Sequence, residues 1–147
     1  MSNKRQSIVD AIEGRMKTIL TDNGYATNAG RNVFDWRITQ IPDTELSAIS
    51  IYDGDCTIDY EETPVGLQGH FLIVDLVSDA KGSAARSDVR KINADVVKAI
   101  GTDLTWGGLA IDTDLISHGL NMEQGDKSIG AGIVRIKIHY RTPLWET

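Results

Sequence analysis

Four side chains that can carry a positive charge alternate with apolar side chains near the end of the chain, over residues 133–141. Because successive side chains of a β-strand leave on opposite faces, this alternation predicts a half-buried strand with one apolar and one basic face. Asp and Glu of the same sheet can neutralise such a row, or the row can form an interface with an acidic surface on another copy or another protein. The sequence leaves both interpretations open. We call these residues the basic row: Arg135, Lys137, His139 and Arg141.

A second charged group precedes Pro64, where Asp59, Glu61 and Glu62 form a small acidic cluster. Clustered carboxylates are usually solvated in a loop. They can also form a docking face for cations, which the basic row of a neighbouring copy would supply. The basic row and the acidic cluster are therefore the candidate interface residues of the chain.

Residue types that catalyse reactions or bind metals occur, but no recognisable motif contains them. Cys56 lacks the surroundings of a nucleophile, and Asp53-Gly54-Asp55 lacks the further ligands of a calcium loop, so we interpret them as a small strand residue and a turn. The three histidines fall on separate strand-like segments without zinc-motif spacing. We therefore expect no enzymatic activity, no metal and no cofactor. The histidines are His70, His118 and His139.

The composition predicts one globular domain spanning residues 1–147. Hydrophobic residues make up 41% of the chain and charged residues 24%, which are ordinary values for a folded, non-membrane protein. The formal net charge of -6 argues against sequence-independent binding of nucleic acid, which needs a surplus of Lys and Arg. A single cysteine fits a reducing compartment, and the first residues show no signal-peptide pattern, so we expect synthesis in the cytoplasm.

Two amphipathic helices are predicted, over residues 7–20 and 83–100. In each segment, apolar residues recur at the spacing of one helical face, and most charged residues occupy the remaining positions. Asn23-Gly24 and Gly101 follow them as stop signals.

Extended segments account for much of the remaining chain. Asp53-Gly54 lies between two of them and is a hairpin signal, while Gly125-Asp126 joins the last two. Residues 71–74 are apolar at every position, which places their strand in the middle of the sheet. The order of elements predicts an α+β fold, a mainly antiparallel β-sheet with two amphipathic helices packed on one face. The expected strands cover residues 33–38, 48–52, 56–60, 66–77, 109–124 and 128–142.

Three further expectations concern the sheet. Gly130 and Gly132 lie inside the last strand and indicate a β-bulge or a close backbone contact. Residues 57–69 and 115–128 exceed what a compact core requires, so we expect parts of these arms to project and to become ordered against a partner. The apolar side of the last strand should lie beneath both helices. That side comprises Val134, Ile136, Ile138 and Tyr140.

Several segments together resemble the tail terminators of long-tailed bacteriophages. The resemblance covers nearly the whole chain and consists of packing and turn features. It involves the opening helix, residues 33–39 leading into Pro42 and residues 45–51, the block of residues 91–113, and the closing residues 134–145.

The resemblance implies a small α+β subunit of the virion that forms a hexameric ring. Such a ring caps the finished tail tube, stops its polymerisation, and offers a surface to the neck proteins that join tail to head. The implied partners are other copies of the chain, the tail tube protein and the head-tail connector, while genomic DNA passes through without specific binding. Individual residues facing the lumen, the tube or the neck do not follow from the resemblance.

Two alternative functions remain open at this stage. A head-tail connector or neck protein of the virion would need the same acidic ring-forming subunit. A small cytosolic enzyme or ligand-binding domain belongs to a different class, and it would be a monomer with a deep apolar pocket.

Overall fold

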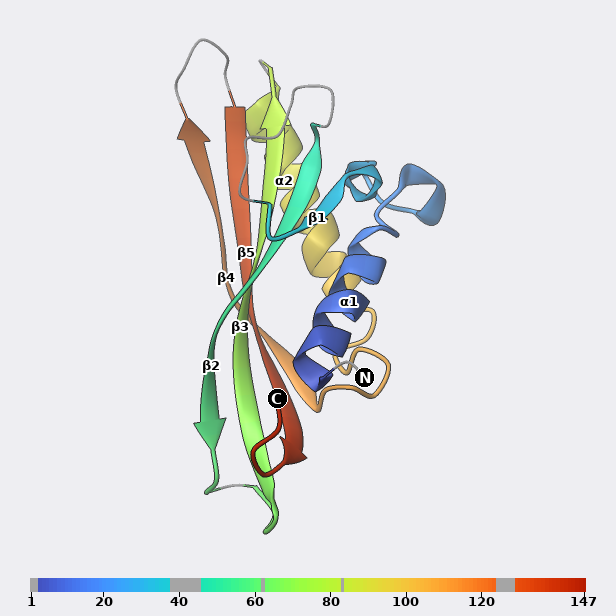
Figure 1. Ribbon diagram of the computed structural model, residues 1–147. Helices are drawn as coiled ribbons and strands as arrows, with labels where there is room; N and C mark the ends of the chain where they lie inside the picture. The colour runs from blue at the N-terminus through green and yellow to red at the C-terminus, as the bar shows by residue number, and fades with distance from the viewer. Residues whose placement is uncertain (1–2, 38–45, 62, 83, 124–128) are drawn as a thin grey trace.

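A long twisted sheet of five strands carries both helices on one face (Figure 1). The computed structural model describes residues 3–37, 46–61, 63–82, 84–123 and 129–147. The strand order is β1-β2-β3-β5-β4, and every neighbouring pair is antiparallel except the parallel pair of β1 and β2. The predicted α+β fold class is therefore confirmed. The elements are α1 (Lys4–Met16), η1 (Thr21–Asn23), η2 (Ala29–Arg31), β1 (Val33–Asp35), β2 (Ala48–Asp59), β3 (Leu67–Lys81), α2 (Ala85–Ile100), β4 (Asp112–Glu123) and β5 (Ile129–Pro143).

The strand β3 occupies the middle of the sheet, as its apolar centre predicted. It pairs with β5 along its whole length and with β2 along most of its length. The strands β4 and β5 form the expected final hairpin. The proposed turn at Gly125-Asp126 lies outside the described residues.

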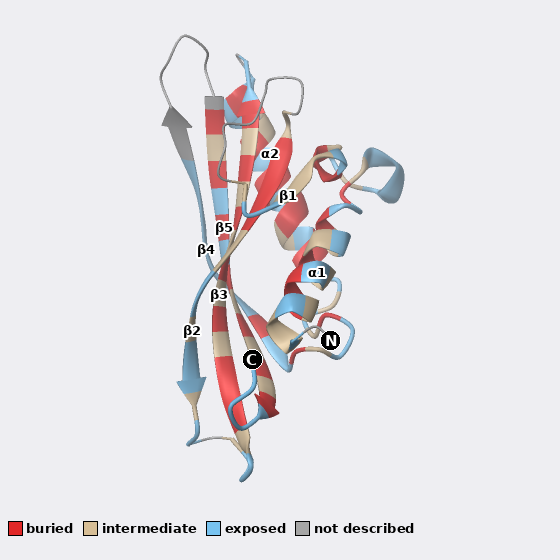
Figure 2. Ribbon diagram, viewed as in Figure 1, coloured by how far each residue is buried: buried red, intermediate tan, exposed pale blue. Residues whose placement is uncertain are grey.

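The inner face of the sheet and the facing sides of both helices form one apolar core (Figure 2). The four alternate residues of β5 predicted to be buried have no exposed surface. They share this core with Ile12 and Met16 of α1 and with Val89, Ile92 and Val96 of α2. The helix α2 lies against β3 and β5, while α1 contacts β1, β2 and α2. The assignment of the apolar side of β5 to the core is confirmed.

The boundaries of α1 differ from those predicted. The helix begins at Lys4, because the side chain of Asn3 accepts a hydrogen bond of 2.7 Å from the backbone N–H of Gln6, and it ends at Met16. Ile19 remains fully buried in the turn that follows, so the apolar spacing continued past the end of the helix. Gly24, with a φ of 88°, closes the short helix η1 instead.

The prediction of a hairpin at Asp53-Gly54-Asp55 was wrong, because β2 continues through these residues as one strand. The register with β3 shifts by one residue between Asp53 and Cys56, which is a β-bulge. Gly54 lacks the positive φ that a type I′ hairpin turn requires. Arg5 of α1 holds the bulge in place, since its guanidinium donates to Asp53 Oδ2 and to the carbonyl oxygen of Gly54, each at 2.8 Å.

Two other elements are shorter than predicted. The strand β1 ends at Asp35, and Trp36 leaves it with a φ of 53°. The first residue of the predicted second helix, Ser83, and the end of the predicted first strand, Ile38, lie outside the described residues. The helix α2 begins at Ala85 and continues to Ile100, followed by Gly101 as predicted.

Gly130 and Gly132 allow α2 to approach β5 closely. A Cβ atom at Gly132 would lie 2.5 Å from Val89 Cγ1, and one at Gly130 would lie 3.1 Å from the carbonyl oxygen of Ala85. The register between β5 and β3 is unbroken here, so the close backbone contact, and not the bulge, accounts for the two glycines.

We predict that Ile136→Ala lowers the free energy of unfolding by about 2–5 kcal/mol, because it leaves a cavity in the core. Ile133 lies on the opposite face of the same strand and is 41% exposed, so it provides a matched control. Ile133→Ala should cost about 0.5 kcal/mol. Chemical denaturation of the unassembled subunits measures both losses. Equal losses would contradict the assignment of the inner face.

A second prediction tests the contact between α2 and β5. Gly132→Ala should destabilise the subunit by about 1–3 kcal/mol, because the new methyl group overlaps Val89 and Asn93. Gly119 lies on the neighbouring strand β4 with nothing near its would-be Cβ atom. Gly119→Ala should therefore be close to neutral in the same thermal denaturation experiment. A tolerated Gly132→Ala would show that α2 does not pack this closely.

Candidate functional site

The basic row lies on the outer face of the sheet, which no described helix covers (Figure 1). Arg135 binds Asp75 of β3 with two hydrogen bonds, from Nε at 2.7 Å and from Nη2 at 3.0 Å. The register also places Asp114 of β4 opposite Lys137, and Asp112 opposite His139. A carboxylate of the same subunit therefore binds Arg135, and one lies opposite Lys137 and another opposite His139 on the neighbouring strand.

An aromatic ring holds two members of the basic row in place. The rings of His139 and Phe71 are stacked with their centroids 4.4 Å apart, and Lys137 Nζ lies 5.5 Å from the Phe71 centroid. Arg141 is partly buried at the far end of the row. These contacts favour the interpretation of the basic row as a solvated face that its own sheet neutralises.

The acidic cluster lies at the tip of the β2–β3 hairpin. Asp59 is the last residue of β2, and its Oδ1 accepts a hydrogen bond of 3.1 Å from the backbone N–H of Glu61. Glu62 lies outside the described residues. The register aligns Asp59 with Gly69 of β3, and Gly69 with Arg141 of β5. The fold thus brings the acidic cluster and one end of the basic row to the same end of the sheet.

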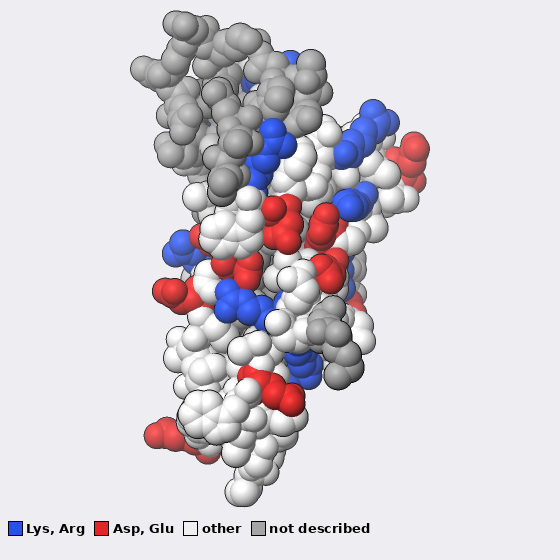
Figure 3. Space-filling model, in the orientation of Figure 1, with Lys and Arg blue, Asp and Glu red and all other residues white. Residues whose placement is uncertain are grey.

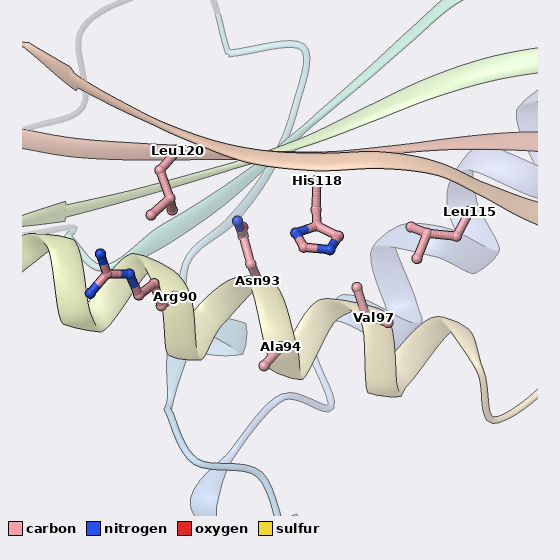
Figure 4. Close-up of a pocket in the computed structure, with 7 residues that line it drawn as sticks. All are labelled: Arg90, Asn93, Ala94, Val97, Leu115, His118 and Leu120. Carbon is pink, nitrogen blue, oxygen red and sulfur yellow. The ribbon is translucent and has the colours of Figure 1, made fainter.

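A groove with a volume of about 550 Å³ separates α2 from the edge strand β4 (Figure 4). It forms because α2 lies mainly over β3 and β5 and covers the inner side of β4 only in part. Leu115 and Leu120 point into it and remain 49% and 43% exposed, whereas their cross-strand neighbours on β5 are buried. The groove is lined by Arg90, Asn93, Ala94, Val97, Leu115, His118 and Leu120.

The opposite end of the sheet carries a second set of exposed apolar side chains. We call this end the distal arm, defined as residues 56–61, 63–70 and 141–147. Figure 3 shows the lower end of the molecule as a largely uncharged surface interrupted by acidic side chains. The exposed apolar residues of the distal arm are Ile58, Tyr60, Val65, Leu144 and Trp145.

Within the distal arm, buried polar side chains of β3 hold the chain that follows β5. His70 and Thr142 are joined by a hydrogen bond of 2.7 Å between Nε2 and Oγ1. Gln68 Nε2 donates to the carbonyl oxygen of Glu146 at 2.7 Å, and Gln68 Oε1 accepts from the backbone N–H of Trp145 at 3.4 Å. The backbone around Trp145 is therefore held while its side chain remains 92% exposed.

Cys56 and His70 form a pair that the sequence did not reveal, with Sγ 3.6 Å from Nδ1. Burial raises the pKa of the Cys56 thiol. Burial, reinforced by the charges of Lys4 and Arg5, lowers the pKa of His70. Both groups are therefore neutral near pH 7, whereas a nucleophilic cysteine needs a lowered pKa. The pair belongs to the buried polar cluster and lacks the electrostatics of a thiolate nucleophile.

Asp53 links three separate segments at the bulge. It accepts hydrogen bonds from Arg5 Nε at 2.8 Å and from Trp36 Nε1 at 2.5 Å. Burial alone would raise the pKa of Asp53, but the hydrogen bonds from Trp36 and Arg5 outweigh it and hold the pKa below its usual value. Asp53 thus anchors α1 and the residue that follows β1 to β2, while Asp55 of the same turn-like sequence remains exposed.

Within the described part of the chain, no group of three or more His, Cys, Asp or Glu side chains is placed to hold a metal ion. No helix formed by the described residues has the length and apolar character to cross a membrane. The predicted histidine positions fall on three strands, with His70 buried, His118 in the groove and His139 on the outer face.

No family model matches the chain, and no curated protein matches it. The geometry of the chain therefore has to carry the functional assignment. Two exposed apolar surfaces of the described residues are the groove and the distal arm. Both overlap the arms that the sequence predicted to project, residues 57–69 and 115–128, but the groove wall from α2 and the exposed Trp145 were not among the candidates drawn from the sequence. The available signals were the apolar residues of β4 and a Trp that follows Pro143 in a short polar segment.

A prediction follows for the pH dependence of stability. The stabilisation that ionised Asp53 contributes should be fully present above its unfolded pKa of about 3.9. It should be lost as the pH falls through the lower pKa of the folded state. The melting temperature of Asp53→Asn should thus lie below that of the wild type near pH 7, and the difference should shrink below about pH 4.

The matched control is Asp55→Asn, because the Asp55 side chain is exposed in the same bulge. Its melting temperature should follow that of the wild type over the whole pH range. A difference for Asp53→Asn that stays constant down to about pH 2 would contradict the role assigned to the Asp53 carboxylate.

Proposed function

We propose that the chain is a ring-forming structural subunit of a long-tailed bacteriophage, a tail terminator that caps the tail tube. The observation that carries this proposal is the pair of unlike exposed apolar surfaces, the groove beside β4 and the distal arm beyond the bulge of β2. The resemblance of nearly the whole chain to tail terminators supports the same assignment. In this role the ring stops polymerisation of the tube and presents a surface to the neck proteins.

Unlike surfaces on one subunit favour a ring over a two-fold dimer. A two-fold contact buries the same surface on both partners, whereas a head-to-tail contact joins two different surfaces and closes when the rotation permits it. The groove lies beside the edge strand β4, whereas the distal arm lies at the end of the sheet formed by β2, β3 and β5. Each copy could therefore contact two neighbours at once.

The charge of the subunit agrees with a conduit that DNA crosses without being bound. The formal net charge is -6, and Arg135 is already engaged by Asp75. The outer face therefore presents few unpaired cations that could bind phosphate groups of DNA. In the assembled tail, the basic row and the acidic cluster of Asp59, Glu61 and Glu62 are the charged surfaces that this proposal assigns to contacts with the tube or neck proteins.

The alternatives differ in partner or in assembly. A head-tail connector would use the same ring but would bind the head and leave the tube end free. A ligand-binding domain would place a small apolar molecule in the groove, whose volume lies in the range of small-molecule sites. Leu115 and Leu120 remain about half exposed there, however, which is typical of an open docking surface and not of an enclosed pocket.

The proposal predicts a defined particle and a defined activity. The purified chain should form a particle of about six times 16.1 kDa, measured by sedimentation, with a ring visible in negative-stain images. Added to polymerising tail tubes of the phage that encodes it, the chain should stop their growth and appear as extra density at one tube end.

Two outcomes would contradict the assignment. Tubes of unchanged length with no density at their ends would exclude a tail terminator, and binding to heads alone would indicate the connector alternative. Bovine serum albumin, an unrelated acidic protein, is the control for nonspecific effects of negative charge on tube growth.

A further inference from the structure

We propose that the distal arm of one subunit docks into the groove between α2 and β4 of the next copy. This inference rests on the proposed ring and identifies the contact that would build it. The occupant of the groove is a second copy of this chain, and Trp145 is the central anchor of the contact.

The groove has the character of a recipient surface. Ala94 and Val97 line it from α2, and Leu115 and Leu120 line it from β4 (Figure 4). Together these side chains form an apolar surface that is open to solvent. The helix lies closer to β5 than side chains at Gly130 and Gly132 would allow, and in this position it leaves Leu115 and Leu120 partly exposed. Apolar surface of this kind at a sheet edge is stabilised by a partner.

Trp145 has the character of an anchor. Its φ of 64° is unusual for a bulky residue. The buried Gln68 fixes the backbone here, because its Oε1 accepts from the Trp145 N–H and its Nε2 donates to the carbonyl oxygen of Glu146. An exposed aromatic side chain on a fixed backbone loses little conformational entropy on binding. Such Trp and Tyr residues dominate the binding energy of many interfaces. Tyr60 and Val65 flank the same end of the sheet and enlarge the apolar surface.

Charge complementarity supports this choice of occupant. Among the described residues that line the groove, Arg90 and His118 are ionisable and none is a carboxylate. No carboxylate of the described residues lies within ion-pair distance of Arg90. The distal arm carries the exposed side chains of Glu61 and Glu146 and the partly exposed Asp59. An acidic, apolar arm thus matches a basic, apolar groove.

The positions of the two surfaces make the contact directional. The groove lies along the edge strand β4, and the distal arm lies at one end of the sheet, where β2, β3 and β5 continue past the last paired residues of β1 and β4. A contact between them leaves the groove of one subunit and the distal arm of the other unoccupied. Repetition of this single contact adds subunits in one direction until a ring closes.

Single substitutions test each side of the contact in the full-length chain. Trp145→Ala should weaken self-association about 30-fold, as expected for loss of an interface anchor. Arg90→Glu should weaken it about tenfold or more, because it replaces attraction by repulsion. Adding Glu61→Lys and Glu146→Lys to Arg90→Glu should restore association. Sedimentation over a range of protein concentrations measures each effect, and circular dichroism checks that the subunits are folded.

Mixing two variants tests the direction of the contact. Arg90→Glu subunits keep a functional distal arm, and Trp145→Ala subunits keep a functional groove. Each variant alone should remain largely monomeric. The mixture should form a one-to-one dimer and no larger species, because only one intact contact can form between the two variants.

The control is Lys91→Glu, which reverses an exposed charge on α2 beside Arg90 but outside the groove. Its association should equal that of the wild type. Rings that survive Trp145→Ala and Arg90→Glu unchanged would overturn the docking contact and leave the tail-terminator proposal intact. A wild-type chain that is monomeric at all concentrations would also overturn the contact. Loss of tube capping by a chain that still forms rings would instead count against the proposed function alone.

Discussion

The width of a helix relative to the spacing of strands determines much of this structure. An α-helix with its side chains is about 10 Å wide and strands lie about 4.8 Å apart, so one helix covers about two strands. The helix α1 contacts β1 and β2, and α2 lies over β3 and β5. The edge strand β4 is therefore only partly covered by α2, and its inner apolar side chains line a groove. The buried apolar core contains no described residue of β4, and the described apolar side chains of β4 remain partly exposed at the surface of the subunit.

Close packing makes this arrangement rigid. Gly130 and Gly132 remove the side chains that would separate α2 from β5, and Val89 and Asn93 occupy the space. Asn93 also donates a hydrogen bond of 3.2 Å to the carbonyl oxygen of Gly119 on β4. The position of α2 relative to β4, and with it the depth of the groove, thus depends on Gly130 and Gly132 of β5 and on the hydrogen bond from Asn93 to β4. A binding surface on regular elements of this kind needs little rearrangement before a partner can occupy it.

The distal arm depends on polar contacts in place of an apolar core. Beyond the bulge none of the described helices covers the sheet, and the inner face there is closed by His70, Gln68, Thr142 and the chain after β5. These buried groups satisfy one another, which avoids the cost of leaving polar atoms unpaired. The result is an extension of the sheet that holds Trp145 at a fixed position. Asp53 connects this extension to α1 and Trp36, so the distal arm and the helical layer form one unit.

Local sequence determined those features that show as a regular spacing of apolar residues along the chain. Alternation over residues 133–141 was sufficient to assign the inner and outer faces of β5, and the spacing of apolar residues was sufficient to locate α2. Local sequence did not determine the backbone path at Asp53-Gly54, where the dipeptide alone favours a hairpin. Contacts of Asp53 with Arg5 and Trp36, which are distant in sequence, stabilise a bulge there instead. The pairing of Arg135 with Asp75 depended equally on the register of two strands distant in sequence. The groove and the fixed Trp145 required the full tertiary structure, since what covers a side chain depends on which elements pack above it. Periodicity shows which side of a strand is apolar, and only the packing of distant elements decides whether that side is buried.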